Sequence, residues 1–171
     1  GRSPAGKERT MEFRAMNEQE IRGWYSQEFI QTFPPNEQKP LHFILELIAG
    51  GRYTLMGLYN GPSLLGYASL QTHPDCPGYI LLDYLGVTAA RRNEGLGGHM
   101  LSLLEEKFRG KSCLIVEAES PIPGGDEAEN ALRNRRIGFY ERSGLQRVYE
   151  MGACGIRCQV LTLGNPGGPD V

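Results

Sequence analysis

The chain has 171 residues and a mass of 19.0 kDa, which is the size of one ordinary domain. Apolar residues make up 40% and charged residues 22% of the sequence, so a disordered, collagen-like or coiled-coil protein is excluded. The 18 basic and 20 acidic side chains leave a net charge of −2, and no apolar run approaches the roughly 20 residues that cross a bilayer. We therefore expect neither nucleic acid nor a membrane as a partner.

The fold is expected over residues 11–163. It begins with a short strand over residues 11–16, followed by a helix. Asn17 offers an N-cap for this helix, and Glu20 stands at the third helical position, as in a capping box. Apolar residues at helical spacing predict a second helix through residues 41–48, which two glycines end.

The middle of the chain has mainly strand character. Residues 53–59 and 64–70 are predicted strands joined by an Asn-Gly-Pro-Ser turn, which is typical of a hairpin. Residues 79–87 are nearly all apolar, as expected of a central strand covered on both faces. A helix over 96–108 follows, and then a buried strand over 113–118. The unit from strand through helix to strand should cross over right-handed, so that its two strands run parallel.

The C-terminal part is expected to hold one helix and two strands. Residues 120–127 are a Pro- and Gly-rich loop, and a helix follows around residues 130–142. Residues 145–151 and 156–163 are the last two predicted strands. The whole order of elements indicates an α/β protein with a mixed sheet. The polar residues 1–10, a flexible segment or tag remnant, and the Gly/Pro-rich tail 164–171 are expected to lie outside the fold.

The cysteine and histidine spacing argues against a metal site. The chain has only three histidines, and no two of its four cysteines are separated by two residues, so the spacing of zinc ligands is absent. The first twenty residues lack the apolar block of a secretory signal. We therefore expect a cytoplasmic protein with free thiols, and disulfides in an oxidising compartment are the alternative. The cysteines are Cys76, Cys113, Cys154 and Cys158.

A glycine-rich turn lies between the predicted strand that ends at Val87 and the helix that follows it. Unpaired N–H groups and the positive end of the helix dipole at such a position bind phosphate or pyrophosphate. A nucleoside-triphosphate loop requires Lys after its last glycine, but His99 follows Gly98. A dinucleotide loop requires a third glycine where Met100 stands. A plain tight connection is the remaining structural alternative.

The remaining pattern is Arg-x-x-Gly-x-Gly from Arg92 to Gly97. It resembles the acetyl-CoA pyrophosphate loop of the GCN5-related N-acetyltransferase (GNAT) superfamily. Downstream, Tyr140 stands four residues before Gly144, which also fits that family. The chain departs from the family at two positions, because Arg133 and Arg136 replace the usual Asn and Ala seven and four residues before the tyrosine.

The resemblance implies a mixed, mostly antiparallel twisted sheet of about 6–7 strands with helices on both faces. It implies direct transfer of the acetyl group of acetyl-CoA to a primary amine of a small molecule or peptide, without a metal. Neither the acceptor nor the oligomeric state follows from the sequence, and a homodimer is left open. The residues implied to bind acetyl-CoA are Leu85, Gly86, Val87, Arg92, Asn93, Glu94, Gly95, Leu96, Gly97 and Gly98.

Three side chains are candidates for the chemistry. The family assigns the tyrosine, Tyr140, to the departing thiolate, although it could instead be a core aromatic next to Phe139. Asp83 and Glu117 are carboxylates inside apolar strands, where burial would raise their pKa values and suit a general base. The alternative function is a GNAT-like module that binds an acyl-CoA without turning it over.

Overall fold

The computed structural model describes residues 11–153 and 156–164. Seven strands form one sheet in the order β1-β2-β3-β4-β5-β7-β6. The β4–β5 pair is parallel, whereas β1–β2, β2–β3, β5–β7 and β6–β7 are antiparallel. The predicted mixed and mostly antiparallel sheet is therefore confirmed. The expectations for residues 1–10, and for the tail beyond residue 164, lie outside the described residues.

The elements follow one another as the sequence predicts, with a few differences at their ends. The strands are β1 (Met11–Ala15), β2 (Tyr53–Asn60), β3 (Ser63–Gln71), β4 (Tyr79–Val87), β5 (Cys113–Glu119), β6 (Gln146–Ala153) and β7 (Ile156–Leu163). The α-helices are α2 (Glu18–Trp24), α3 (Ile30–Thr32), α4 (Leu41–Ala49), α5 (Leu96–Phe108) and α6 (Glu127–Arg142). A π-helix, Tyr25–Phe29, joins α2 to α3, and two 3₁₀ turns occupy Pro35–Glu37 and Ala89–Arg91.

Two of these differences have local causes. Helix α6 begins at Glu127 rather than near residue 130, because the Asp126 carboxylate accepts a hydrogen bond of 2.9 Å from the Glu129 N–H and so caps the helix earlier. The expected single helix after Asn17 contains a π-helical turn, in which the Ile30 N–H donates to the Tyr25 carbonyl. Apolar periodicity does not distinguish this turn from a continuous α-helix.

The chain divides into two compact units. The first comprises residues up to Thr72 together with Tyr84–Met100, and the second comprises His73–Asp83 and the residues from Leu101 onward. The expectation of one domain over residues 11–163 stays a prediction.

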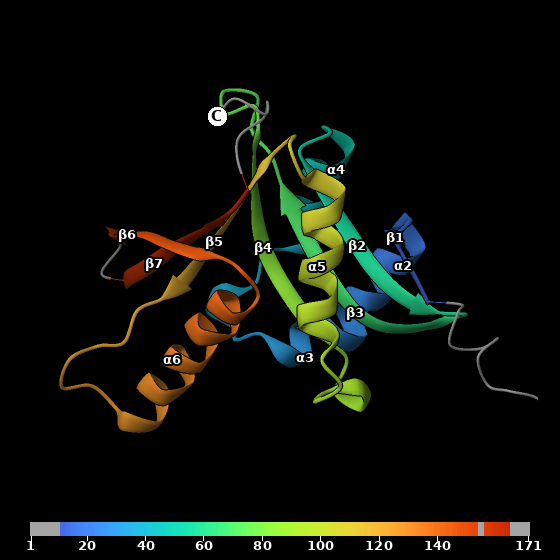
Figure 1. Cartoon of the computed structure of the whole chain (residues 1–171). Helices are drawn as coiled ribbons and strands as arrows, with labels where there is room; N and C mark the ends of the chain where they lie inside the picture. The colour runs from blue at the N-terminus through green and yellow to red at the C-terminus, as the bar shows by residue number, and fades with distance from the viewer. Residues whose placement is uncertain (1–10, 154–155, 165–171) are drawn as a thin grey trace, which may run out of the picture. The chain divides into compact units, whose positions relative to one another are not determined.

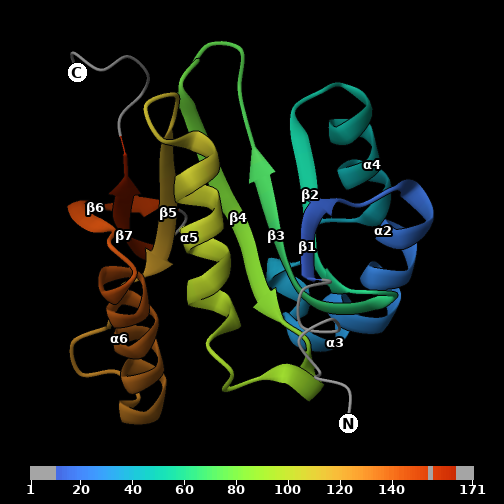
Figure 2. The same ribbon diagram turned by 45° about the vertical axis from the view of Figure 1, so that its right-hand side comes forward.

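An aromatic core fills one side of the first unit. The indole of Trp24 lies 5.4 Å from the Tyr67 ring, and Phe29 lies 4.7 Å from the Tyr84 ring, as measured between centroids. All four side chains are buried. Helix α4 packs against β2 in the same unit (Figure 2). The helical segment that starts with α2 therefore covers the face of β3 on which Tyr67 lies.

The opposite face of β3 is covered by the start of α5. Gly66 precedes Tyr67, so a side chain at this position would point to the other face. A Cβ at Gly66 would lie 2.8 Å from the Cε atom of Met100, which belongs to the first turns of α5. Helices therefore lie on both faces of the sheet within this unit, as predicted.

The second unit holds β5, β6, β7 and α6, and α6 contacts β5 and β6 (Figure 1). Buried and open positions alternate along β5, where Leu114, Val116 and Ala118 are buried. Among the described cysteines, Cys76, Cys113 and Cys158 are free thiols, and Cys154 lies outside the described residues.

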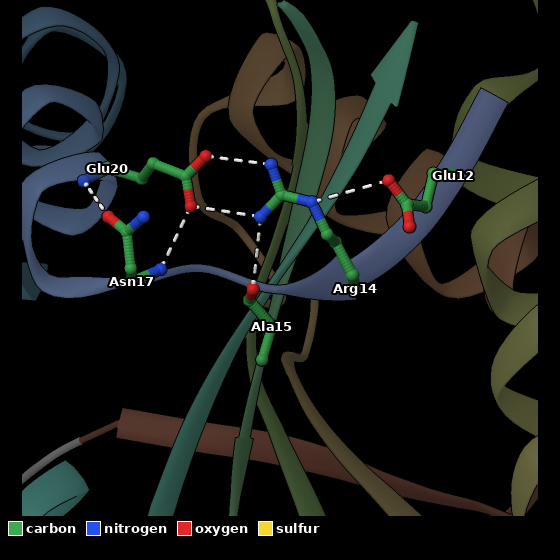
Figure 3. A network of polar contacts seen from close by, with 5 residues as sticks. All are labelled: Glu12, Arg14, Ala15, Asn17 and Glu20. Carbon is green, nitrogen blue, oxygen red and sulfur yellow. Dashed lines mark hydrogen bonds and ion pairs between the residues drawn. The ribbon is translucent and has the colours of Figure 1, made fainter. Parts of the chain in front are cut away.

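A polar network fixes the first helix to β1 (Figure 3). The Asn17 side chain accepts a hydrogen bond from the Glu20 N–H at 2.8 Å, and the Asn17 N–H donates to the Glu20 carboxylate at 2.9 Å. Arg14 forms two further bonds to the same carboxylate, of 2.9 and 2.8 Å. These bonds from Arg14 and the Asn17 backbone lower the pKa of Glu20 to about 2. The predicted capping box is confirmed, with an arginine added to it.

The substitution Glu20→Gln tests this network. Because the folded-state pKa lies below the ordinary value of 4.5, the ionised carboxylate contributes stability above about pH 4.5, and this contribution is lost as the pH falls through about 2. We expect the variant to lose about 1 kcal/mol of unfolding free energy at pH 7. The difference from the unsubstituted protein should shrink toward pH 2 in denaturant titrations. Glu18→Gln, which breaks an exposed ion pair with Arg22, should cost less than about 0.5 kcal/mol, and a pH-independent effect of Glu20→Gln would contradict the assignment.

Gly86 of β4 packs so closely against the Tyr67 side chain of β3 that only glycine fits at position 86. A Cβ built at Gly86 would overlap the ring and the hydroxyl of Tyr67. We expect Gly86→Ala to destabilise the protein by about 1–3 kcal/mol through overpacking. Gly23→Ala is the matched control, because a Cβ there meets nothing within 4 Å and should stabilise α2 by about 0.5–1 kcal/mol. Equal melting temperatures for the two variants would show that Tyr67 moves aside freely.

Candidate functional site

The connection between β4 and α5 contains two residues with left-handed backbone angles. Asn93 has φ of 68° and Gly95 has φ of 74°, while Arg92 between the 3₁₀ turn and Asn93 is extended, with φ of −70° and ψ of 155°. Left-handed backbone is unusual for a residue other than glycine. Where left-handed and right-handed residues alternate, successive backbone N–H groups point toward one concave surface. Such a surface can bind an anion.

The first N–H groups of α5 have no acceptor of their own. The His99 N–H donates to the Gly95 carbonyl at 3.1 Å, so α5 begins its hydrogen bonding there. Within residues 11–153 and 156–164, the N–H groups of Leu96, Gly97 and Gly98 have no recorded backbone acceptor. These three groups lie at the positive end of the helix dipole. The arrangement can bind a pyrophosphate through the backbone alone.

Neighbouring contacts hold this loop in place. The Thr88 N–H donates to the Leu65 carbonyl of β3, and the Arg91 N–H donates to the Thr88 carbonyl, both at 2.9 Å. The Arg91 guanidinium pairs with Glu94 at 3.1 Å. Glu94 is therefore a stabiliser of the loop conformation, and an acetyl-CoA contact by its side chain stays a prediction. Thr88 is a residue whose role the sequence pattern did not reveal.

The predicted loop residues differ in exposure. Leu96 points into the core and is buried. Gly97 and Gly98 are half-buried. The exposed residues are Arg92, Asn93, Glu94 and Gly95. For Arg92, no ion pair is recorded with any residue of the described chain, so its guanidinium is available to a phosphate.

The end of β4 supplies the second part of the predicted acetyl-CoA site. Leu85, Gly86 and Val87 are all half-buried. The preceding residue is tied to β3, since the Tyr84 N–H donates to the Ser69 hydroxyl at 2.7 Å. The Tyr67 ring underlies Gly86. Sequence reasoning missed Tyr67, because a tyrosine in an apolar strand has the pattern of an ordinary core residue.

Tyr140 lies near the end of α6 in the second unit. Its ring contacts Phe139 edge-on, with centroids 5.2 Å apart, and the side chain is half-buried. Burial raises the pKa of the phenol to about 12, although Arg136 opposes this rise. The side chain is therefore a neutral hydrogen-bond donor over the whole physiological range, and its environment disfavours proton delivery.

The two candidate carboxylates lie on neighbouring strands of the second unit, each beyond the last residue pair that joins these strands. Parallel pairing between β4 and β5 runs from Tyr79–Cys113 to Leu81–Ile115, and Asp83 and Glu117 each lie two residues past the last pair. Asp83 is half-buried and Glu117 is exposed. The burial expected for Glu117 is wrong, because alternation along β5 turns this side chain to the open face.

Arg133 stands where the family pattern has Asn, and its side chain contacts residues of its own unit. Its guanidinium pairs with Glu119 at 3.4 Å and donates to the Asn130 side chain at 3.0 Å. Asn130 in turn exchanges two hydrogen bonds with the backbone of Ile122, of 2.8 and 2.7 Å. Arg133 thus fixes the loop after β5.

The described residues contain neither a metal cluster nor a membrane span. Within residues 11–153 and 156–164, no three His, Cys, Asp or Glu side chains gather in a way that could hold a metal ion. Of the helices described, none has the length and apolar character needed to cross a membrane.

Solved structures with the same fold include acetyltransferases. A GNAT-family protein from Bacteroides thetaiotaomicron is 21% identical, with a TM-score of 0.70, and the match covers 90% of this chain and 87% of that one. A GNAT-family protein from Desulfovibrio desulfuricans is 22% identical, with a TM-score of 0.66 and coverage of 90% and 98%. Spermidine N-acetyltransferase from Vibrio cholerae, in complex with CoA and spermine, is 9% identical, with a TM-score of 0.63 and coverage of 91% and 95%.

Sequence comparison identifies the family. No curated protein matches the chain significantly. The sequence pattern of the acetyltransferase (GNAT) family, however, matches residues 18–145, which is more than half of the chain and includes the loop at the start of α5 and Tyr140. The protein therefore belongs to the acetyltransferase (GNAT) family, whose members are acetyl-CoA-dependent acyltransferases.

Proposed function

We propose that the protein transfers the acetyl group of acetyl-CoA directly to a primary amine of a small molecule or peptide. The observation that carries this proposal is the run of unpaired N–H groups at the start of α5, preceded by the left-handed residues Asn93 and Gly95. Family membership supports it, and the similar Vibrio cholerae spermidine N-acetyltransferase holds CoA in its structure.

Each part of the acetyl-CoA site has a distinct role in the proposal. The N–H groups of residues 92–98 bind the pyrophosphate, and Arg92 adds a positive charge beside it. The backbone of Leu85, Gly86 and Val87 pairs with the amides of the pantetheine arm as an added strand. Recognition through the backbone does not depend on particular side chains. Arg133 and Arg136 therefore do not prevent the pantetheine arm from pairing with β4.

The acceptor must lose a proton before it attacks the thioester carbonyl. For a lysine-like amine of pKa about 10.4, deprotonation at pH 7 costs roughly 4.6 kcal/mol, and for an α-amine near 8 it costs only about 1.4 kcal/mol. Asp83 is the better placed of the two candidate bases, because it is half-buried whereas Glu117 is exposed. Either carboxylate can act through a water molecule.

Tyr140 stabilises the leaving sulfur by donating a hydrogen bond. When the amine nitrogen bonds to the carbonyl carbon, the C–S bond breaks and negative charge develops on the sulfur. A phenol with a pKa of about 12 would protonate a thiolate whose acid has a pKa near 8.5 only at a cost of about 5 kcal/mol. Solvent therefore supplies the proton after the thiolate has left.

The substitution Tyr140→Phe tests this role. We expect kcat to fall by about 10²-fold, since one transition-state hydrogen bond is removed, while the KM for acetyl-CoA changes less than about threefold. The measurement is thiol release during acetyl transfer to a panel of primary amines. Tyr149→Phe is the matched control, because Tyr149 is exposed on β6 and should keep full turnover.

The same assay separates the proposal from its alternative. Acetyl-CoA binding without thiol release for any amine would indicate a binding module rather than an enzyme. Normal turnover of the Tyr140→Phe variant would refute the assignment of this residue.

A further inference from the structure

A small pocket lies at the end of β5, within the second unit. Its volume is about 290 Å³, at the lower end of the range of small-molecule sites. The residues that give the pocket its character are Glu119, Ile122, Arg133, Ile156 and Arg157, and all of them belong to the second unit. Among the described residues, none of those assigned to acetyl-CoA or to the chemistry lines it. The proposed function therefore leaves this pocket without a role.

The Arg133 guanidinium is the least exposed charged group of the pocket, and only part of it is hydrogen-bonded. The side chain is 15% exposed. Its Nε donates to Glu119 at 3.4 Å, and its Nη1 donates to the Asn130 side chain at 3.0 Å. A guanidinium has five N–H bonds, and for the other three, including both on Nη2, no acceptor is recorded in the described part of the chain. Nη2 is not among the fully buried atoms without a partner, so a ligand in the pocket can reach it.

The ion pair with Glu119 does not saturate Arg133. Charge-assisted N–H···O bonds are usually about 2.7–2.9 Å long, so a single contact of 3.4 Å is a weak one. Arg14 and Glu20 show the contrast, because they form two bonds of 2.9 and 2.8 Å. Arg133 therefore keeps the capacity to bind a further planar oxyanion through two parallel hydrogen bonds.

Hydrogen bonds of the protein itself hold the walls of the pocket. The Asn130 side chain exchanges two bonds with the Ile122 backbone, of 2.8 and 2.7 Å, and accepts the bond from Arg133. The Ser120 N–H donates to the Arg157 carbonyl at 2.9 Å and so joins the end of β5 to β7. The loop after β5 and the guanidinium of Arg133 are thus positioned before a ligand arrives, which limits the entropy lost on binding.

The charges of the lining favour a single negative charge on the ligand. Arg133 and Arg157 supply two positive charges and Glu119 one negative charge. Arg157 also pairs with Glu150 at 2.8 Å, but the two side chains are 57% and 43% exposed, so water screens this pair. The excess of one positive charge in the lining matches a monoanion, whereas a dianion would be repelled more strongly by Glu119.

The remaining wall of the pocket is apolar. Ile122 and Ile156 both line it, although 52% of the first residue and 45% of the second are exposed. A ligand with an apolar body would remove part of this surface from water, which is favourable. The wall therefore favours a ligand that carries hydrocarbon beside its charged group.

We propose that this pocket binds a small monocarboxylate with an apolar body. Arg133 donates two hydrogen bonds to the carboxylate, and Arg157 adds a second positive charge. Ile122 and Ile156 contact the body of the ligand. A neutral molecule of the same shape is disfavoured, because it cannot form charge-assisted bonds with Arg133.

An NMR titration tests the site without any acetyl transfer. The backbone amides of Ser120, Ile122 and Arg157 and the Nε–H of Arg133 report on this pocket, separately from the loop at the start of α5. We expect saturable shifts with isovalerate. Isovaleramide, which has the same shape without the charge, should bind at least tenfold more weakly. Acetate, which lacks the apolar body, and inorganic phosphate, which is mainly a dianion at pH 8, should each bind at least threefold more weakly.

Substitutions identify the responsible groups. Arg133→Gln should weaken isovalerate binding at least tenfold. Arg135→Gln is the matched control, because it removes the same charge from an exposed position of the same helix, and it should leave binding unchanged. Ile122→Ser keeps the backbone bonds of the loop and should weaken isovalerate binding at least threefold while acetate binding stays the same. Unchanged affinity of the Arg133→Gln variant, equal binding of isovaleramide, or tighter binding of phosphate would overturn the proposal.

Acetyl transfer distinguishes two sources of the carboxylate, and only this part of the test rests on the proposed function. If the acceptor carries the carboxylate, 6-aminohexanoate should have a kcat/KM at least tenfold above that of hexylamine, and Arg133→Gln should remove the difference. If a separate ligand carries it, the two amines should react alike while isovalerate still binds; both results support the site. Isovalerate binding without thiol release for any amine would refute the proposed function alone, and thiol release without isovalerate shifts at the pocket would refute the pocket alone.

Discussion

The unpaired backbone N–H groups at the start of α5 are the constraint on which the rest of the structure depends. They are available because the chain leaves β4, makes a 3₁₀ turn, and passes through left-handed backbone at Asn93 and Gly95 before the helix begins. The bonds from Thr88 to Leu65 and from Arg91 to Thr88 hold this path in place. A pyrophosphate can then be bound by atoms whose positions are fixed before the ligand arrives, which limits the entropy lost on binding.

The aromatic core of the same unit combines tight packing with unsatisfied polar atoms. The aromatic core packs tightly enough that Gly86 can carry no side chain over Tyr67, yet it leaves two polar atoms unsatisfied. Buried polar atoms of this kind are uncommon in natural cores, because each costs free energy that an apolar group of the same shape would not. Glu28 adds a carboxylate without a recorded partner, whereas the nearby Glu20 is fixed by Arg14 and the helix cap.

The sequence predicted those structural features that depend on residues close together in the chain. The capping box at Asn17, the hairpin turn, the exact span of β4 and the glycine loop all follow from residues close together in the chain. The π-helical turn and the early start of α6 were not predicted, because each depends on one or two hydrogen bonds that leave apolar periodicity unchanged. The burial of Tyr67 beneath Gly86 could not be predicted either, since it depends on which strands become neighbours.

The most direct test of the pyrophosphate site is a backbone amide NMR titration with CoA. The account predicts that the amide resonances of Gly95, Leu96, Gly97 and Gly98 show the largest saturable shifts, and that pantetheine, which lacks the pyrophosphate, leaves them nearly unchanged. Saturating CoA binding without shifts at these four amides would contradict it, and so would equal shifts with pantetheine.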